Sequence, residues 1–315
     1  MADRPVRRIL VIKLGALGDI VLSFMAFGAI RRHHPEATIV LLTTPPFEEL
    51  ANKSGWFDEV WPLGRPGNWH VGEWLTLARR LRGGKFDQVY DLQRSGRTRR
   101  YRRLMTWLGG GGARWPAVGP RGELIALGDP RSEPIHTAER HMEYLTQAGI
   151  TDTTPADLSW LTSGFPERFG LSDGFLLLAP GGSPHRPEKR WPAERFAELA
   201  SRVAMEGTRP VLIGTQAEAA VNSAIAAASP EAMDLTGKTS LFDIAAMATR
   251  AQIAVGNDTG PMHLIAAAGC PSVVLFSDAS DPARTAPRGP YVVVMRKPNL
   301  ADLPLTEVAA AMRLR

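Results

Sequence analysis

The polar turn at residues 256–263 carries groups suited to binding an anion. It reads Gly-Asn-Asp-Thr-Gly-Pro-Met-His and stands between the apolar run Ile253–Val255 and an alanine-rich stretch that ends at Ala268. This order predicts a buried strand that leads into a helix. The first N–H groups of a helix have no internal partner and the helix dipole is positive there, so the turn favours a phosphate. An ordinary capped turn, with Asp258 as the cap or its neighbour, is the alternative.

A second candidate site follows the first apolar run of the chain. The turn Lys13-Leu14-Gly15-Ala16-Leu17-Gly18-Asp19 ends in a carboxylate. Ligands of open parallel sheets bind at the carboxyl edge of the strands, and the two glycines let a substrate approach the backbone closely. Asp19 at this edge can accept a proton from a hydroxyl as a general base. The alternative is an acidic residue that only complements a helix dipole.

Three further segments of the second half carry polar residues at the ends of predicted strands. Pro180-Gly181-Gly182-Ser183 follows the run Phe175–Ala179, at the same sheet edge as Asp258, and Lys189-Arg190-Trp191-Pro192 comes shortly after it. A lysine in that loop can stabilise a diphosphate as it gains charge on leaving, or it is simply solvated. Glu218 follows the run Pro210–Gly214, where an acid can bind ribose hydroxyls or start a helix.

The glycine-rich turns argue against two common nucleotide-binding classes. The first turn lacks the G-x-G-x-x-G pattern, and the second strand ends in Leu42-Thr43-Thr44 without an acid for a ribose, which disfavours a dinucleotide dehydrogenase. Thr236-Gly237-Lys238-Thr239 resembles the end of a P-loop, but Ala232 stands where a glycine is required. A P-loop NTPase is therefore disfavoured as well.

These turns are expected to be positioned by two α/β domains. Apolar runs at 8–14, 38–43, 59–63 and 88–92 alternate with helical candidates at 19–32, 73–82 and 97–108. In the second half, runs at 175–179, 210–214, 233–235, 253–255, 272–276 and 291–295 alternate with helices at 193–203, 218–228, 241–248 and 261–268. Fully apolar strands that alternate with helices predict parallel sheets covered on both faces.

The domain boundary is expected where this alternation stops, near Thr151–Asp173. We predict two Rossmann-like, doubly wound domains that face one another across a cleft, residues 1–160 and residues 161–300. Residues 301–315 contain a predicted terminal helix, which either crosses back to the N-terminal domain or packs on its own domain.

Composition describes a globular protein without a membrane span. The 315 residues are 44% hydrophobic, and no apolar run approaches the roughly 20 residues that a span requires. The first eight residues lack the apolar region of a secretory signal, so a cytoplasmic location is expected. The lone cysteine, Cys270, excludes an internal disulfide and is expected to be buried and inert.

Positive charge is concentrated in the first half of the chain. Residues 1–150 contain 22 Lys and Arg against 15 Asp and Glu, whereas the remainder contains 15 against 17. Much of the excess comes from an acid-free cluster, Arg94, Arg97, Arg99, Arg100, Arg102 and Arg103. Such a cluster fits an anionic membrane surface or a polyanionic substrate, and nucleic acid less well because no base-stacking pattern accompanies it. A merely solvated helix face is the alternative.

Taken together, these segments resemble glycosyltransferase family 9, the heptosyltransferases of lipopolysaccharide core assembly. The matching motifs are K-x-G-x-x-G-D at Lys13–Asp19, PGGS and K-R-W-P within Pro180–Pro192, the acid Glu218, and D-T-G-x-x-H at Asp258–His263. Tyr90-Asp91-Leu92-Gln93 and residues 140–149 also resemble the family. The motifs follow one another in the family's order over nearly the whole chain.

The resemblance implies a GT-B fold and an inverting transfer from ADP-heptose to an anionic glycolipid of the Kdo–lipid A type. The implied transfer needs neither a metal nor another cofactor. In agreement, the chain contains no D-x-D triplet that could hold a metal ion. The resemblance also implies that Asp19 is the general base and that Lys189 holds the leaving diphosphate. The other donor residues implied are Gly182, Ser183, Glu218, Asp258, Thr259, Gly260 and His263. The acceptor residues expected are Lys13, Gly15, Gly18, Arg94, Arg97 and Arg100.

Several alternatives stay open at this point. The loop between Gly181 and Lys189 is longer than the usual family spacing, with Pro184–Pro187 inserted. The arginine cluster binds the acceptor, the inner face of the inner membrane, or only solvent. A non-catalytic nucleotide-sugar-binding protein on the same scaffold, or a transferase that uses another nucleotide sugar, fits the same motifs. Asp19 distinguishes a transferase from the non-catalytic binding protein, because a pure binder does not need a carboxylate that faces an acceptor.

Overall fold

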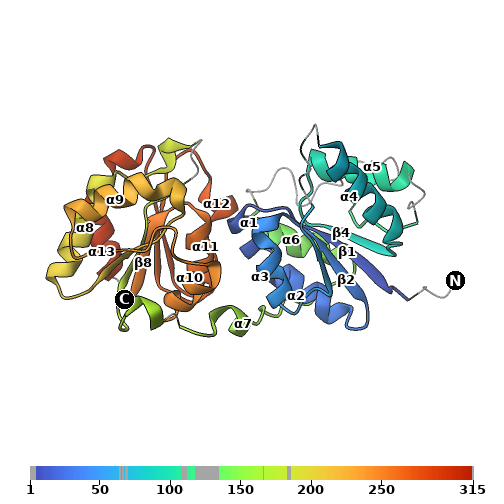
Figure 1. The fold of residues 1–315 in the computed structure, drawn as a ribbon, viewed down its shortest axis with the longest axis horizontal. Helices are drawn as coiled ribbons and strands as arrows, with labels where there is room; N and C mark the ends of the chain where they lie inside the picture. The colour runs from blue at the N-terminus through green and yellow to red at the C-terminus, as the bar shows by residue number, and fades with distance from the viewer. Residues whose placement is uncertain are drawn as a thin grey trace. The chain divides into compact units, whose positions relative to one another are not determined.

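The chain forms two compact units in the computed structural model, which describes residues 5–63, 65, 67, 70–107, 112–117, 135–165, 167–182 and 186–313. Unit 1 is Met1–Asp157 and unit 2 is Leu158–Arg315. In Figure 1 unit 1 runs from blue to green and unit 2 from green to red. The division falls inside the segment 151–173, where the sequence loses its alternation of strands and helices.

Unit 1 is built on a four-stranded parallel sheet with the strand order β3-β2-β1-β4. The strands are β1 Arg8–Ile12, β2 Thr38–Leu42, β3 Glu59–Trp61 and β4 Gln88–Asp91. The helices are α1 Leu17–Val21, α2 Phe24–His33, α3 Glu48–Lys53, α4 Val71–Gly83, α5 Gly96–Trp107 and α6 Thr137–Thr146, with a 3₁₀ turn, η1, at Pro45–Phe47.

Alternate residues of the unit 1 strands enter two different cores. Leu10, Ile12, Val40, Leu42 and Val89 pack in one buried cluster with residues of α4 and α5, including Leu77, Leu81, Tyr101 and Met105. Their neighbours Ile9, Val11, Ile39 and Leu41 are also buried and point to the opposite face, because successive side chains of a strand alternate. The sheet is therefore buried on both faces, as its apolar strands predict.

Unit 2 is built on a six-stranded parallel sheet with the order β10-β9-β8-β5-β6-β7. The strands are β5 Leu176–Ala179, β6 Pro210–Leu212, β7 Met233–Asp234, β8 Ile253–Asn257, β9 Ser272–Phe276 and β10 Val292–Arg296. The helices are α7 Ser159–Thr162, α8 Ala193–Met205, α9 Ala219–Ala228, α10 Leu241–Ala248, α11 Gly260–Ala267, α12 Pro282–Thr285 and α13 Leu305–Arg313. Short 3₁₀ turns are η2 Glu167–Phe169, η3 Pro187–Lys189, η4 Gln216–Glu218 and η5 Leu300–Asp302.

Helices cover both faces of the unit 2 sheet, with α8, α9 and α13 on one side and α10 and α11 on the other (Figure 1). One core joins Leu176, Leu178, Val255 and Leu275 of the strands to Phe196 and Leu199 of α8. The terminal helix α13 contacts α8 and β9 and contributes Val308 and Ala311 to this core. A contact of residues 301–315 with unit 1 stays a prediction.

Several boundaries differ from the sequence-based expectation. The helix expected at 19–32 is two helices, α1 and α2, and the Ser23 hydroxyl between them donates a hydrogen bond to the backbone oxygen of Asp19 (2.7 Å). Serine competes for backbone groups in this way and interrupts helices. The helix expected at 97–108 corresponds to α5, Gly96–Trp107, and Leu108 lies outside the described residues.

Helix α6 was absent from the expected elements because polar residues lie on its buried side. Thr137 and His141 are buried together with Met142, Tyr144 and Leu145, so the apolar period of the helix is incomplete in the sequence.

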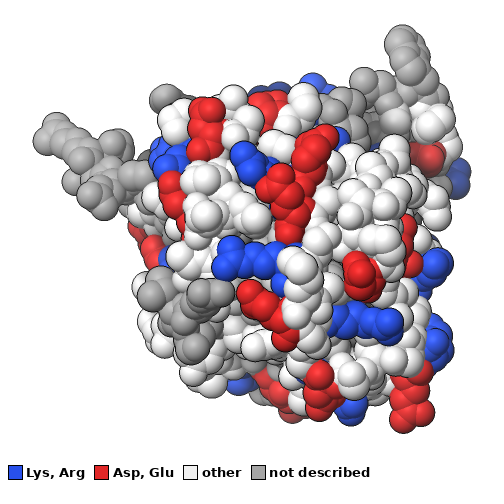
Figure 2. All heavy atoms as spheres, turned by 90° about the vertical axis from the view of Figure 1, so that its left-hand side faces the viewer, with Lys and Arg blue, Asp and Glu red and all other residues white. Residues whose placement is uncertain are grey.

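Charge is evenly mixed on unit 2. Residues 158–315 contain 15 basic and 15 acidic residues, and the two kinds of side chain are interspersed on the face of unit 2 shown in Figure 2. The net positive charge of the chain therefore comes from unit 1. Within the described part of the chain, no helix has the length and apolarity needed to cross a bilayer.

Candidate active site

The strand order of unit 2 changes direction between β5 and β8. From β5 the chain proceeds to β6 and β7 on one side, whereas β8, β9 and β10 build outward on the other side. Ligands of doubly wound sheets bind where the connections diverge in this way. The loop Pro180–Gly182 follows β5 and the pair Asp258–Thr259 follows β8, so both loops border this point.

Asn257, the last residue of β8, ties these loops together. Its amide nitrogen donates to the backbone oxygens of Pro180 (2.7 Å) and Gly181 (3.2 Å), and its Oδ1 accepts from the backbone N–H of Trp191 (2.9 Å). The side chain is fully buried. No role was predicted for Asn257 from the sequence, although a polar residue at the end of an otherwise apolar strand was a usable signal.

A partly buried ion pair lies at the same edge of unit 2. Lys189 Nζ is 2.7 Å from Asp258 Oδ2, and the two side chains are 17% and 8% exposed. The Ser280 hydroxyl donates to the same carboxylate oxygen at 2.6 Å. Two of the residues predicted to bind a donor are therefore in direct contact, and Ser280 is an additional member that the sequence analysis missed.

Helix α11 begins directly after this ion pair. Thr259 precedes the helix in an extended conformation, and Gly260 and Pro261 are its first residues. Proline has no N–H, so the backbone donors at this helix end are those of Thr259 and Gly260. His263 is buried inside the same helix.

Glu218 both starts a helix and lies beside the loop after β5. Its Oε2 accepts hydrogen bonds from the backbone N–H (2.8 Å) and hydroxyl (2.6 Å) of Thr215, which completes a capping box. A β-carbon built on Gly181 would lie 2.5 Å from Glu218 Cγ, so a larger residue at that position would require the Glu218 side chain to move. The sequence-based alternatives, a ribose contact or a helix start, are therefore compatible with one another.

Gly182 is buried and its backbone oxygen accepts a hydrogen bond from Arg190. Ser183 and Pro184 lie outside the described residues.

Unit 1 has an equivalent point of divergence between β1 and β4, and a pocket lies there. The pocket has a volume of about 380 Å³. Its lining residues are Lys13, Asp19, Leu92, Gln93, Arg94, Thr137, Arg140 and His141. Three predicted residues, Lys13, Asp19 and Arg94, are thus brought together within unit 1. Thr137, Arg140 and His141 come from α6, and no role had been predicted for them.

Lys13 is buried in this pocket and is held by polar groups of unit 1. Its ammonium group donates to the backbone oxygen of Leu92 (3.3 Å) and lies 3.3 Å from Nε2 of His141. Burial lowers the pKa of Lys13 to about 8, and the nearby charge of Arg140 adds to this effect while Asp19 and Asp91 oppose it. Burial and the adjacent charge of Lys13 lower the pKa of His141 to about 3, so this imidazole is neutral at physiological pH.

Asp91 shapes the turn that brings Gln93 and Arg94 to the pocket. Its Oδ1 accepts from the backbone N–H groups of Gln93 (3.1 Å) and Arg94 (2.8 Å). Gln93 in turn accepts from the backbone N–H of Leu14 (2.9 Å), which joins the loops after β1 and β4. Burial raises the pKa of the Asp91 carboxyl.

The remaining predicted acceptor residues lie in different surroundings. Gly15 has a φ of +99°, and a β-carbon there would lie 2.5 Å from the Phe47 ring, so the backbone itself requires glycine. Gly18 is part of α1. Arg97 and Arg100 belong to α5 and do not line the pocket of Lys13; Arg100 lines a separate groove between α4 and α5.

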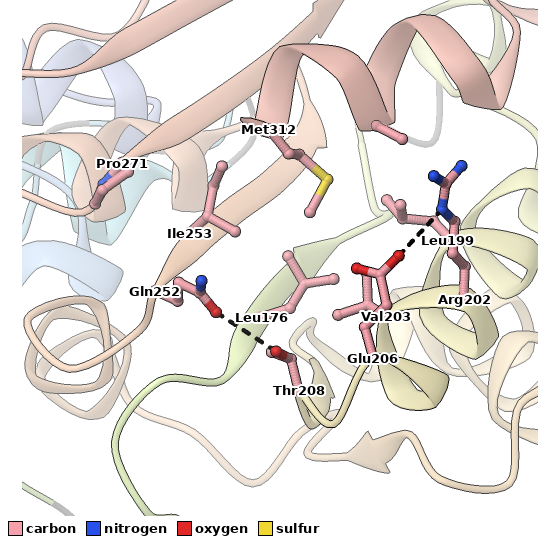
Figure 3. A pocket seen from close by; sticks show the side chains of 11 residues that line it. Leu176, Leu199, Arg202, Val203, Glu206, Thr208, Gln252, Ile253, Pro271 and Met312 are labelled. Atoms are coloured by element: carbon pink, nitrogen blue, oxygen red, sulfur yellow. Dashed lines mark hydrogen bonds and ion pairs between the residues drawn. The ribbon is translucent and has the colours of Figure 1, made fainter. Parts of the chain in front are cut away.

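Unit 2 has a further pocket at the opposite edge of its sheet (Figure 3). It has a volume of about 250 Å³ and lies beside Leu176 and Ile253, the first residues of β5 and β8. Leu199 and Val203 of α8 and Met312 of α13 supply apolar walls. None of the predicted site residues lines this pocket, and its position at the amino-terminal strand ends separates it from the loops described above.

Comparison with known proteins agrees with this architecture. The model of the family described as Glycosyltransferase family 9 (heptosyltransferase) matches residues 146–310. Lipopolysaccharide heptosyltransferase 2 of Escherichia coli (strain K12) is 28% identical over 299 residues, which cover 87% of this chain and 83% of that protein.

Solved structures extend the likeness to nearly the full length of the chain. A glycosyl transferase family 9 protein from Veillonella parvula DSM 2008 aligns with a TM-score of 0.78 at 22% identity, covering 97% of this chain and 95% of the other. The E. coli ADP-heptose lps heptosyltransferase II aligns with a TM-score of 0.74 at 25% identity, covering 97% and 98%. The fold is that of the GT-B glycosyltransferases, as the sequence predicted. The chain belongs to glycosyltransferase family 9, the heptosyltransferase family, and is an enzyme of glycosyl transfer.

Proposed function

We propose that the protein transfers a heptose, or a closely related sugar, from ADP-heptose to an anionic lipopolysaccharide core acceptor of the Kdo–lipid A type. The observation that carries this proposal is the position of the charged groups. Lys13, Asp19 and Arg94 line the pocket beside β1 and β4, and Lys189 and Asp258 lie at the divergence point of the second sheet. The membership in a heptosyltransferase family supplies the reaction class.

In the proposed reaction Asp19 is the general base. It accepts the proton of the acceptor hydroxyl while that oxygen forms a bond to the anomeric carbon of the donor sugar. The bond from this carbon to the diphosphate oxygen breaks in the same step, and its electron pair leaves with ADP. One displacement of this kind inverts the configuration at the anomeric carbon.

The charge that develops on the leaving diphosphate is assigned to residues of unit 2. Lys189 and the N–H groups of Thr259 and Gly260 are donors that can stabilise it without a divalent ion. Gly182 and Ser183 would border the diphosphate and Glu218 the ribose, with Asp258 and His263 near the donor sugar or diphosphate. Residues 161–300 would thus bind the donor.

The acceptor is assigned to residues 1–160. Lys13 and Arg94 supply positive charge for its anionic sugars, next to the backbone of Gly15 and Gly18, and Arg97 and Arg100 are further candidates on α5. The mechanism requires that Asp19 and the turn Thr259–Gly260 face one shared pair of substrates. The reaction would take place in the cytoplasm, at the inner face of the inner membrane.

The test is a transfer assay with ADP-heptose and a Kdo–lipid A acceptor, with the product detected by mass and its anomeric configuration by NMR. Asp19→Asn is expected to bind ADP normally and to lose transfer by a factor of about a hundred or more. Glu36→Gln, which removes an exposed carboxylate of unit 1, is the matched control and should behave as wild type. EDTA should leave the rate unchanged. If Asp19→Asn retains transfer, the general base is another residue. If thermal-shift assays show a preference for UDP or GDP over ADP, ADP-heptose is not the donor.

A further inference from the structure

Helices α4 and α5 expose large apolar side chains that the proposed reaction does not use. Val71 is 66% exposed, Leu75 50% and Trp107 82%. They make up half of the six strongly exposed large hydrophobic residues in the part of the chain that the structure describes. Val71 and Leu75 are one turn apart on the same side of α4. Apolar residues grouped in this way mark interaction surfaces.

The two helices contact each other, and a groove of about 500 Å³ lies where they meet. Its lining residues are Trp74 of α4 and Arg100, Arg103, Leu104 and Trp107 of α5. Arg100, Arg103 and Trp107 follow the i, i+3, i+7 spacing of one helix face. Indole rings and guanidinium groups therefore border the same open groove.

The charge of this helix pair is almost entirely positive. Residues 71–83 and 96–107 contain eight arginines and one acidic residue, Glu73. Arg99, Arg100 and Arg103 are exposed on α5, and Arg79 and Arg82 on α4. The contrast with the mixed charges on the visible face of unit 2 is direct (Figure 2).

We propose that this α4–α5 surface, formed by Val71, Trp74, Leu75, Arg99, Arg100, Arg103 and Trp107, docks on a bilayer that contains anionic phospholipids. Arginines bind the phosphate groups, tryptophan occupies the boundary between headgroups and acyl chains, and the aliphatic side chains enter the outer acyl region. The ligand of this surface is bulk lipid and not the acceptor, and Arg100 is the one member of the surface that is also a candidate acceptor residue.

Two other partners fit the same residues less well. Nucleic acid would satisfy the arginines, but the exposed aliphatic side chains of Val71 and Leu75 gain nothing from a phosphate backbone. A second copy of the chain in a symmetric contact would bring the arginine-rich helices against one another, and like charges would oppose the contact.

The experiment is flotation of the full chain with phosphatidylcholine vesicles, with and without phosphatidylglycerol. Wild type is expected to float with the anionic vesicles only, and high salt should reduce this binding. Arg99→Gln/Arg103→Gln should weaken the binding at least about tenfold. Arg209→Gln/Lys238→Gln, which removes two positive charges from unit 2, is the matched control and should bind as wild type.

A second measurement reports on depth and does not depend on charge. Lipids brominated in the acyl chain should quench part of the tryptophan fluorescence of vesicle-bound wild type, and Trp107→Phe should lose that part while still binding. Equal binding to neutral and anionic vesicles, or equal loss in both double variants, would overturn the proposal. Tight binding of wild type to heparin or DNA without binding to vesicles would also overturn it. So would a wild-type dimer that dissociates in Arg99→Gln/Arg103→Gln.

The failure of this proposal is distinguishable from the failure of the proposed reaction. Transfer to a soluble, deacylated acceptor is expected to be unchanged in Arg99→Gln/Arg103→Gln. Absence of transfer by wild type in that assay would contradict the proposed reaction and leave the vesicle result intact.

Discussion

Lys189 and Asp258 are 69 residues apart in the sequence, yet their side chains form a 2.7 Å salt bridge at the divergence point of the unit 2 sheet. If Lys189 also binds the leaving diphosphate, the ligand must share this ammonium group with Asp258. The carboxylate then has two opposing effects: it orients Lys189 and it reduces the positive charge that the ligand meets.

This arrangement predicts that the effects of the two residues on ADP binding are coupled. Lys189→Met should weaken ADP binding by about tenfold to a hundredfold, because a charged hydrogen bond is lost. Asp258→Asn should weaken it less, and the double variant should equal Lys189→Met, since Asp258 acts on the ligand through Lys189. Isothermal titration calorimetry measures all three, with Lys297→Met as a control in an exposed salt bridge. Additive losses would mean that Lys189 and Asp258 contact ADP separately.

Asn257 predicts a variant that links stability to donor binding. Asn257→Ala removes the bonds to Pro180, Gly181 and Trp191 and leaves buried backbone groups without them. The free energy of unfolding should fall by about 2–3 kcal/mol. The loops after β5 and before α8 should also lose their fixed spacing, so ADP binding should weaken.

Asn222→Ala is the matched control for this variant. Asn222 is equally buried and donates to Ile213 and to Thr236, away from the loop Pro180–Gly182. It should cost similar stability in thermal unfolding while leaving ADP affinity unchanged. Equal losses of affinity in both variants would show that Asn257 acts through general destabilisation only.

The sequence was sufficient to predict the sheets because their strands are apolar on both faces. Ser272–Phe276 is buried throughout and Thr38–Leu42 is buried from its second residue on, and these bounds differ from the predicted ones by at most one residue. The segment after β1 was predicted as one helix because the pattern of apolar residues does not reveal the break at Ser23. The break comes with a hydrogen bond from the Ser23 hydroxyl to the backbone oxygen of Asp19.

The candidate site was predictable where glycine turns and charged residues follow a strand directly. Lys13 and Asp258 each follow a strand directly, Asp19 ends the glycine turn after β1, and Lys189 lies further along the connection that begins with the glycines after β5. Arg140 and His141 do not follow a strand in this way, because they lie on α6, 127 and 128 positions after Lys13, and only the fold brings them to the pocket. Arg94 and Arg100 show the reverse: one sequence cluster divides between two pockets because the chain turns into α5 between them.

The buried position of Lys13 predicts how acceptor use depends on pH. The pKa of Lys13 is lowered by burial to about 8 from its ordinary value of 10.5. The ammonium group is therefore charged in the folded protein below pH 8 and neutral above it. His141 beside it is already neutral over this range, because its pKa lies near 3. An anionic acceptor should thus lose one positive partner as the pH rises through 8.

The sign for stability is the opposite of that for acceptor binding. Between pH 8 and 10.5 the unfolded chain holds a proton on Lys13 that the folded chain has released, so this residue makes the free energy of unfolding rise with pH. Lys13→Met should remove that rise, measured as the difference between the urea-unfolding curves of wild type and variant.

For activity, the KM of wild type for the acceptor should increase about fivefold between pH 8 and pH 9, because the charged fraction of Lys13 falls from about a half to about a tenth, while the Kd for ADP stays constant. Lys13→Arg keeps its charge throughout this range, so its KM for the acceptor should not change with pH. Lys13→Met should have the high KM at every pH, because no charge remains to be lost. Steady-state kinetics at saturating ADP-heptose measure these values. If the KM of Lys13→Arg for the acceptor still rises above pH 8, the titration belongs to another group. If kcat instead of KM changes above pH 8 in wild type, the charge of Lys13 acts in the chemical step and not in acceptor binding.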